Sequence, residues 1–186
     1  MSKALVQLEA VFRSIAEATS GKVSGAESLG ELRLDCELFG RQISAYVSEL
    51  KTAEGDKIAP DLEGVVGSPI LGLWIHCPIE KNAEFRIYKM FVKPLLHWGM
   101  KRVKTGDPDC DRRVYILAKN PVAVSPIVLR PDFQQAVKSA FERCDYLEAK
   151  EGKLVFRQSV RSIKMDASFL KSLMESMAKL AICLSA

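Results

Sequence analysis

ELRLDCELFGRQISAYVSEL, residues 31–50, carries the strongest fold signal in the chain, because its apolar residues recur at every second position. Such alternation is typical of a β-strand with one buried face, since successive side chains point to opposite sides of a sheet. Gly40 interrupts the pattern midway, and glycine accepts the backbone angles of a tight turn. We therefore predict an antiparallel hairpin here. Its buried face would carry Leu32, Leu34, Cys36, Leu38, Ile43, Ala45 and Val47.

Further strands are predicted downstream of this hairpin. Residues 51–69 are dense in Gly, Asp, Pro and Lys, which predicts a loop, and short apolar or alternating runs follow it. Glu151 and Gly152 separate the last two runs and predict a second tight hairpin. The predicted strands lie at residues 69–77, 84–91, 114–118, 146–150 and 153–160.

Helices are predicted where the apolar period lengthens and capping residues precede it. Residues 3–18 place Leu5, Leu8, Val11, Phe12 and Ile15 on one helical stripe, which predicts a docking helix. Asn120 before Pro121 predicts the start of a short helix, because asparagine caps and proline suits the first turn. Two longer helices are predicted at residues 131–143 and from Asp166, as N-cap, to about Leu184.

These elements predict an α+β fold, with a mainly antiparallel sheet and helices packed on it. At 186 residues with 48% hydrophobic content, the chain is long enough to bury one full core. We predict a single domain over residues 1–186. Residues 1–30 would form the N-terminal helix and a Gly- and Ser-rich connection, and residues 31–186 the sheet and remaining helices.

Composition favours a soluble protein of a reducing compartment. The 27 basic and 23 acidic residues are mixed along the chain and leave a net charge of +4, which is typical of a solvated surface. The N-terminal stretch carries charges inside its apolar pattern, unlike a secretion signal, and no segment approaches a membrane span. We predict a cytoplasmic protein with reduced thiols. Its five cysteines lack paired spacing: Cys36, Cys77, Cys110, Cys144 and Cys183.

The most informative candidate site is GDPDCDRR, residues 106–113, which sets a turn and five charges before an apolar strand. Its alternating aspartates copy the start of a calcium loop, but Arg112 and Ala118 stand where such a loop needs glycine and glutamate. We predict neither a metal nor a cofactor. One reading is an anion or carboxylate clamp, because arginine presents a planar fork. The other is a structural turn, with Asp107 capping beside Pro108 and Asp111 paired with an arginine. The candidate ligand-binding residues are Asp107, Asp109, Asp111, Arg112 and Arg113.

His97 and Trp98 complete the candidate ligand-binding set. Pro94 prevents a long helix around them, and a loop that carries a histidine beside an aromatic ring can form a pocket wall. His76 precedes Cys77, but neighbours on a strand face opposite ways, so we predict no dyad between them. Lys89 to Lys104 is the most basic stretch and suggests a peripheral membrane or nucleic-acid contact.

Residues 106–184 show a recognisable order of motifs and predicted elements. The order begins with Gly-Asp-Pro and an Asp-Arg-Arg two residues later, and continues with a short strand, a capped helix, a hairpin and an Ala- and Leu-rich closing helix. This order resembles a group of uncharacterised bacterial proteins that share such a carboxy-terminal half. Relatives in that group carry an aromatic residue where this chain has Cys110. The resemblance implies a bacterial origin and an α+β domain of unknown activity, and it supplies no catalytic residue.

The leading functional hypothesis is a non-catalytic binding or assembly domain, self-associating as a homo-oligomer, because no arrangement for chemistry is visible. The first alternative is an enzyme that binds a small molecule or anion through the Asp107 to Arg113 segment. The second is the membrane or nucleic-acid contact through Lys89 to Lys104. A protein partner or self-association is predicted ahead of a small anionic ligand, and nucleic acid is not the expected partner.

Overall fold

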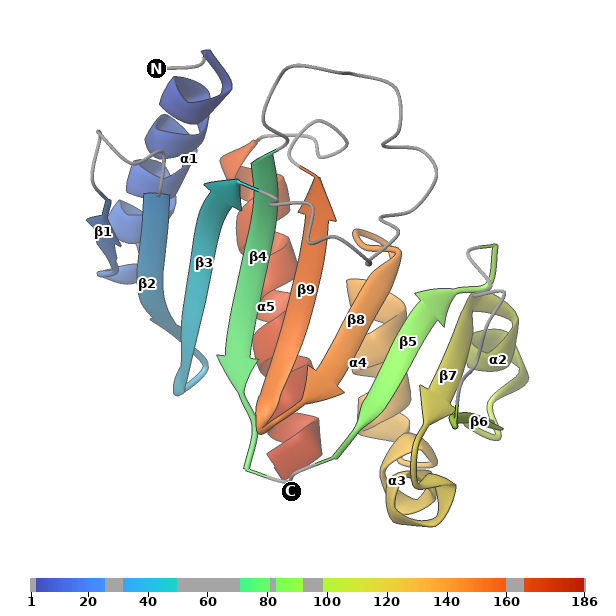
Figure 1. Cartoon of the computed structure of the whole chain (residues 1–186). Coiled ribbons are helices and arrows are strands. Elements are labelled where there is room, and N and C mark those ends of the chain that lie inside the picture. Colours follow the sequence, from blue (N-terminus) through green and yellow to red (C-terminus); the bar gives the residue numbers. More distant parts are fainter. Residues whose placement is uncertain are drawn as a thin grey trace.

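A single antiparallel sheet of nine strands, backed by helices, forms the frame of the computed structural model (Figure 1). The structure describes residues 3–25, 32–49, 71–80, 83–91, 99–159 and 166–185. The strands are β1 (Lys22–Ser24), β2 (Leu32–Leu38), β3 (Arg41–Glu49), β4 (Leu71–Pro78), β5 (Phe85–Lys89), β6 (Lys101–Val103), β7 (Val114–Ala118), β8 (Tyr146–Lys150) and β9 (Lys153–Ser159). The helices are α1 (Lys3–Thr19), α2 (Pro108–Arg113), α3 (Pro121–Val128), α4 (Pro131–Ala140) and α5 (Ala167–Ser185). The predicted α+β class with an antiparallel sheet is confirmed.

The strand order β1-β2-β3-β4-β9-β8-β5-β7-β6 departs from the order of the chain at two places. At the edge of the sheet, β7 lies between β5 and β6. The carboxy-terminal hairpin β8–β9 lies between β4 and β5, so that β9 pairs with β4 and β8 pairs with β5. Figure 1 shows this hairpin in orange between the two green strands. The hairpin therefore joins the amino-terminal strands and the central strands into one continuous sheet.

Both predicted hairpins close through tight turns with left-handed backbone angles at the two central residues. Phe39 and Gly40 have φ of 54° and 73°, and Glu151 and Gly152 have φ of 53° and 71°. Positive φ at both positions is the geometry whose twist matches that of antiparallel strands. The Phe39 side chain is 55% exposed, and the centre of its ring lies 5.1 Å from Lys179 Nζ.

The core fills the space between one face of the sheet and the helices. Cross-strand partners such as Leu34 and Ala45, or Ile75 and Phe156, are buried on this face because directly paired residues point to the same side. α5 packs against β2, β3 and β4, and α4 packs against α5. In Figure 1 these two helices lie behind the sheet, and no described helix crosses its front face. We call that front surface the open face.

α1 confirms the predicted docking helix. Leu8, Phe12 and Ile15 are buried, and α1 contacts β1, β2 and α5.

None of the described helices combines the length and apolar content that crossing a bilayer requires. All five cysteines are free and buried. A cytoplasmic location stays a prediction.

Three local predictions differ from the structure. The connection predicted for residues 19–30 contains β1, which pairs with β2, and β6 was not predicted at all. The turn predicted at 106–113 is instead α2, a helix of six residues capped by Asp107. These elements are too short for their periodicity to show in the sequence. His97, Trp98 and the loop predicted at residues 51–69 lie outside the described residues.

Replacing Phe12 tests how much the docking of α1 contributes to stability. We expect Phe12→Ala to lower the free energy of unfolding by about 3–5 kcal/mol, because a fully buried phenyl ring leaves a cavity. Val6→Ala on the same helix is the matched control, since Val6 is 50% exposed and its change should stay within about 0.5 kcal/mol. Urea unfolding followed by circular dichroism measures both. Equal losses in the two variants would contradict the docking of α1.

Candidate functional site

The segment 105–113 folds into a tight corner that leads from β6 into α2. Gly106 adopts a φ of 79°, a backbone conformation that favours glycine, and an added side chain would also press on Leu129 Cδ2 at 3.2 Å. Asp107 follows as the N-cap of α2, and its Oδ1 accepts a hydrogen bond of 2.9 Å from the amide of Asp109. Pro108 then occupies the first helical position, where its missing N–H is not needed.

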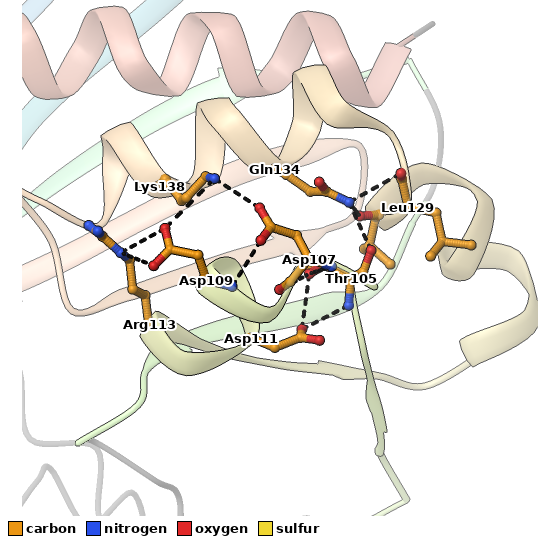
Figure 2. A network of polar contacts seen from close by, with 9 residues as sticks. Thr105, Asp107, Asp109, Asp111, Arg113, Leu129, Gln134 and Lys138 are labelled. Carbon is orange, nitrogen blue, oxygen red and sulfur yellow. Dashed lines mark hydrogen bonds and ion pairs between the residues drawn. The ribbon is translucent and has the colours of Figure 1, made fainter.

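Asp111 fastens this corner from the other end of α2. Its Oδ1 accepts hydrogen bonds from the amide of Thr105 at 2.9 Å and from the Thr105 hydroxyl at 3.0 Å. Thr105 is only 1% exposed, so without this carboxylate its buried amide would lose its partner, and its hydroxyl would keep only the longer bond of 3.3 Å to the carbonyl of Asp107. Figure 2 shows Asp111 below the short helix, turned toward Thr105. The predicted pairing of Asp111 with an arginine is therefore replaced by a bond to threonine.

α4 closes the network from above with two polar side chains one turn apart. Lys138 Nζ lies 2.8 Å from Asp107 Oδ2 and 3.9 Å from Asp109 Oδ2. Gln134 Nε2 donates to the carbonyl oxygens of Thr105 and Leu129 at 2.8 and 3.1 Å. Figure 2 shows both side chains reaching from α4 down to the corner. We call Thr105, Asp107, Asp109, Asp111, Arg113, Gln134 and Lys138 the corner network.

The charges of the corner network are balanced internally. The hydrogen bond from Lys138, together with the amide of Asp109, holds the pKa of the Asp107 carboxyl below its usual value, and Asp107 in turn raises the pKa of Lys138. Arg113 Nε lies 3.4 Å from Asp109 Oδ2 on the surface. Asp107, Asp109, Asp111 and Arg113 thus come together as predicted, but each is engaged with another side chain or with the backbone.

Arg112 is exposed beside this network, and both Arg112 and Arg113 belong to the last turn of α2. A ligand-binding role for the segment stays a prediction. Within the described residues, no three His, Cys, Asp or Glu side chains converge as metal ligands. Sequence reasoning missed Thr105, Gln134 and Lys138; the spacing of four between Gln134 and Lys138, which puts both on one face of α4, was the available signal.

The basic stretch from Lys89 to Lys104 is divided among different partners. Lys89 pairs with Asp145 at 3.1 Å, and the Arg102 guanidinium lies 4.7 Å from the centre of the Tyr115 ring. Lys101 is exposed on the edge strand β6, and Phe91 is 95% exposed. Lys93 lies outside the described residues. A membrane or nucleic-acid contact through this stretch stays a prediction.

A row of large polar and aromatic side chains crosses the open face. The register pairs Arg33 with Tyr46, Tyr46 with Trp74, and Trp74 with Arg157, so these four side chains lie side by side on neighbouring strands. The Tyr46 and Trp74 rings are parallel, with an interplanar angle of 6° and centroids 6.2 Å apart. The Arg157 guanidinium lies 5.3 Å from the centre of the Trp74 ring.

The next row along the strands continues this surface. Asp35, Ser44 and His76 are aligned in register, and Ser44 donates to Asp35 Oδ1. Asp35 also accepts two hydrogen bonds from Arg33 Nε, at 2.8 and 2.9 Å. The Tyr46 hydroxyl lies 3.1 Å from His76 Nε2, and burial, followed by the charges of Lys153 and Arg33, lowers the pKa of His76 below 6.5. His76 is therefore neutral at physiological pH.

We call Arg33, Asp35, Glu37, Tyr46, Trp74, His76, Lys153 and Arg157 the aromatic patch. At its centre, the indole Nε1–H of Trp74 is covered and makes no hydrogen bond. Within the described part of the chain, Lys153 and Arg157 make no ion pair, although carboxylates stand on the same face. Stacked rings and two cations that make no ion pair with any described residue distinguish this patch from the corner network.

The other half of the open face is internally satisfied. Arg86 Nε donates to Glu148 Oε1 at 2.9 Å, and the Tyr146 hydroxyl donates to Glu148 Oε2 at 2.9 Å. A shallow pocket of about 230 Å³ adjoins this half at Glu84, Arg86, Lys119 and Glu148. Its volume is below the roughly 300–1,000 Å³ typical of small-molecule sites, and Lys119 pairs with Glu84 at 3.0 Å. The aromatic patch is therefore the stronger candidate surface.

Replacing Asp111 tests the structural role of the corner network. We expect Asp111→Ala to lower the free energy of unfolding by about 1–3 kcal/mol, because two donors of the buried Thr105 lose their acceptor. Arg112→Ala on the same helix should change it by no more than about 0.5 kcal/mol. Denaturant unfolding measures both variants. An unchanged stability of Asp111→Ala would contradict this role.

Replacing Asp107 by asparagine isolates its charge, because asparagine still caps the helix. The pKa of Asp107 is lowered in the folded chain, so the stabilisation from its pair with Lys138 is present above the unfolded pKa of about 3.9 and is lost as pH falls through the folded value. We expect the difference in Tm between wild type and Asp107→Asn to be constant near neutral pH and to shrink below about pH 4. Thermal unfolding at a series of pH values measures it, and Lys138→Gln should show the same trend. A difference that persists into strong acid would contradict the charge pair.

Comparison with known proteins gives a likeness of fold. No protein-family model matches the sequence, and no curated protein matches it. A solved structure that does match is the crystal structure of the mycobacterial trehalose monomycolate transport factor A, TtfA, with a TM-score of 0.61. The superposition covers 95% of this chain and 94% of that chain, at 9% sequence identity. At such low identity the likeness shows a shared fold, because one fold can host unrelated functions.

Proposed function

We propose that this protein is a non-catalytic binding domain that presents the aromatic patch of its open face to a protein partner. The observation that carries the proposal is the row of stacked Tyr46 and Trp74 rings, with the Arg157 guanidinium 5.3 Å from the centre of the Trp74 ring, on a face of the sheet that no described helix covers. A partner that packs on these rings removes their apolar surface from water, which favours binding.

The composition of the patch supports a protein partner. Tyrosine, tryptophan and arginine are the residues that dominate binding energy at protein interfaces, and here Tyr46, Trp74 and Arg157 stand in one cross-strand row. The rings are already stacked and so lose little conformational freedom on binding. The apolar core lies on the opposite face of the sheet, so the patch is free to serve contact with a partner.

The carboxylates of the corner network are engaged within the chain, unlike the two cations of the aromatic patch that make no ion pair with a described residue. These carboxylates are committed to Thr105, Lys138 and the amides of α2, so the network stabilises the fold where the sequence suggested a clamp. The thiols are also poor candidates for chemistry: burial raises the pKa of Cys77 and of Cys183 to about 11, so both are protonated at neutral pH.

The test compares what the wild type and a patch variant retain from a lysate of the source cells. Arg157→Ala removes an exposed guanidinium from the patch, and Arg112→Ala removes an equally exposed one from α2. We expect partners retained by wild type to be lost with Arg157→Ala and kept with Arg112→Ala, at equal Tm of the three proteins. Identical retention by all three would overturn the proposal for this surface.

A further inference from the structure

We propose that the aromatic patch is a twofold interface between two copies of this chain, in which β2 and β3 of one copy lie over β9 and β4 of the other. The inference rests on the proposed function, because it names the partner of the same surface.

The patch consists of two inner strands that carry aromatic rings, β3 and β4, and two outer strands that carry charges, β2 and β9. The strand order runs β2-β3-β4-β9, so a twofold axis along the boundary between β3 and β4 exchanges the inner strands and exchanges the outer strands. The inner strands carry the rings of Tyr46 and Trp74. The outer strands carry opposite charge, with the carboxylates of Asp35 and Glu37 on β2 and the cations of Lys153 and Arg157 on β9.

An axis parallel to the strands brings complementary groups together. The register places Asp35, Ser44, His76 and Val155 in one row across the four strands. Glu37 and Lys153 lie in the adjacent row. The twofold operation therefore sets Glu37 over Lys153 of the second copy. It also sets Tyr46 over Trp74 of the second copy, so that the aromatic rings of the two copies face each other.

The remaining like charges in this arrangement are already neutralised. Arg33 comes over Arg157 of the second copy, but Arg33 is held by two hydrogen bonds to Asp35 in its own chain. The carboxylate also raises the pKa of Arg33, first through the hydrogen bond and then through its charge, while its own pKa is lowered. Arg157 therefore meets a closed ion pair in place of a free cation.

A twofold axis across the strands fails on charge. With the row of Asp35 and His76 on the axis, Glu37 would face Arg33 of the second copy, which Asp35 already holds. Arg157 would face Lys153 of the second copy, and neither cation has an ion pair among the described residues. Like charges placed opposite each other in an interface cost several kcal/mol and exclude such pairings. The axis along the strands is the arrangement that the charges select.

The same carboxylates argue against nucleic acid as the occupant. Stacked aromatic rings beside Arg157 fit a single-stranded base, but a nucleic-acid site gains its affinity by neutralising phosphates with cations. Asp35 and Glu37 stand within the same patch and would repel the phosphate backbone. A second copy uses both the acidic strand and the basic strand.

A polar face with an aromatic centre favours a reversible dimer over a permanent one, since obligate interfaces are more apolar. The probe is the purified chain itself, followed by sedimentation velocity over a range of concentrations. We expect the wild type to move from the 20.7 kDa chain to twice that mass as concentration rises. A monomer at every concentration would overturn the inference.

Charge swaps test the arrangement. Glu37→Lys places lysine against Lys153 of the second copy, and Lys153→Glu places glutamate against Glu37. Each variant alone should weaken the dimer by about tenfold or more in Kd, because two attractive pairs become repulsive. An equimolar mixture should form a heterodimer with wild-type affinity, because both of its pairs are again lysine against glutamate. The double variant should likewise restore self-association.

Arg112→Ala is the matched control and should dimerise as the wild type does. Circular dichroism of each variant confirms that the fold is kept. A dimer that is unaffected by both single swaps, or that stays weak in the mixture, would overturn the twofold pairing.

The outcomes separate this inference from the proposed function. If the chain is monomeric while Arg157→Ala still loses a partner from the lysate, the inference fails and the proposed function stands. If Arg157→Ala instead abolishes the binding of a single-stranded oligonucleotide by a monomeric wild type, nucleic acid is the occupant and both fail.

Discussion

The pairing of β9 with β4 is the contact on which the rest of the molecule depends. It runs the length of both strands and places Ile75 beside Phe156 and Cys77 beside Leu154 on the buried face. Without it, the strands before β4 and the strands from β5 onward would be two separate small sheets, each with an exposed edge. α5, which follows β9 in the chain, then packs across the join and buries an apolar stripe of leucine and methionine against β2, β3 and β4.

The same pairing determines the two surfaces of the sheet. Side chains of β9 that point inward complete the core, and those that point outward bring Arg157 and Lys153 beside the aromatic rings of β3 and β4. Polar groups are used in two ways in this molecule. In the corner network each charged side chain has a partner within the chain, which holds α2, α4 and β6 together. In the aromatic patch, Lys153 and Arg157 make no ion pair with any described residue, and Arg157 contacts the Trp74 ring instead.

Much of the fold follows from local sequence, and most of the binding surface does not. Alternation in residues 31–50, the stripe of α1 and the cap at Asp166 each act over a few residues, so they predicted β2, β3, α1 and α5 correctly. β1 and β6 have three residues each, too few for a period, and form because a longer strand offers an unpaired edge. Asp107 was recognised as a cap, but the partners of its network come from α4, about thirty residues away, where spacing alone names no target.

The aromatic patch could not be found by scanning for basic or aromatic clusters, because its residues are dispersed over four strands. Arg33, Tyr46, Trp74 and Arg157 become neighbours only through the register of three strand pairings. The last of these pairings joins residues more than eighty positions apart, which no local pattern encodes. The predicted basic stretch, by contrast, is continuous in sequence, and two of its cations, Lys89 and Arg102, have partners within the chain.

The late position of the β8–β9 hairpin in the chain also shapes how the protein is made. During synthesis, β4 emerges from the ribosome with its inner edge open and must wait for about seventy more residues before its partner exists. Contacts at such sequence separation form slowly, and an open strand edge invites pairing with other nascent chains in the meantime. The amino-terminal strands therefore cannot complete their sheet until the β8–β9 hairpin has been synthesised, and the edge of β4 stays unpaired until then.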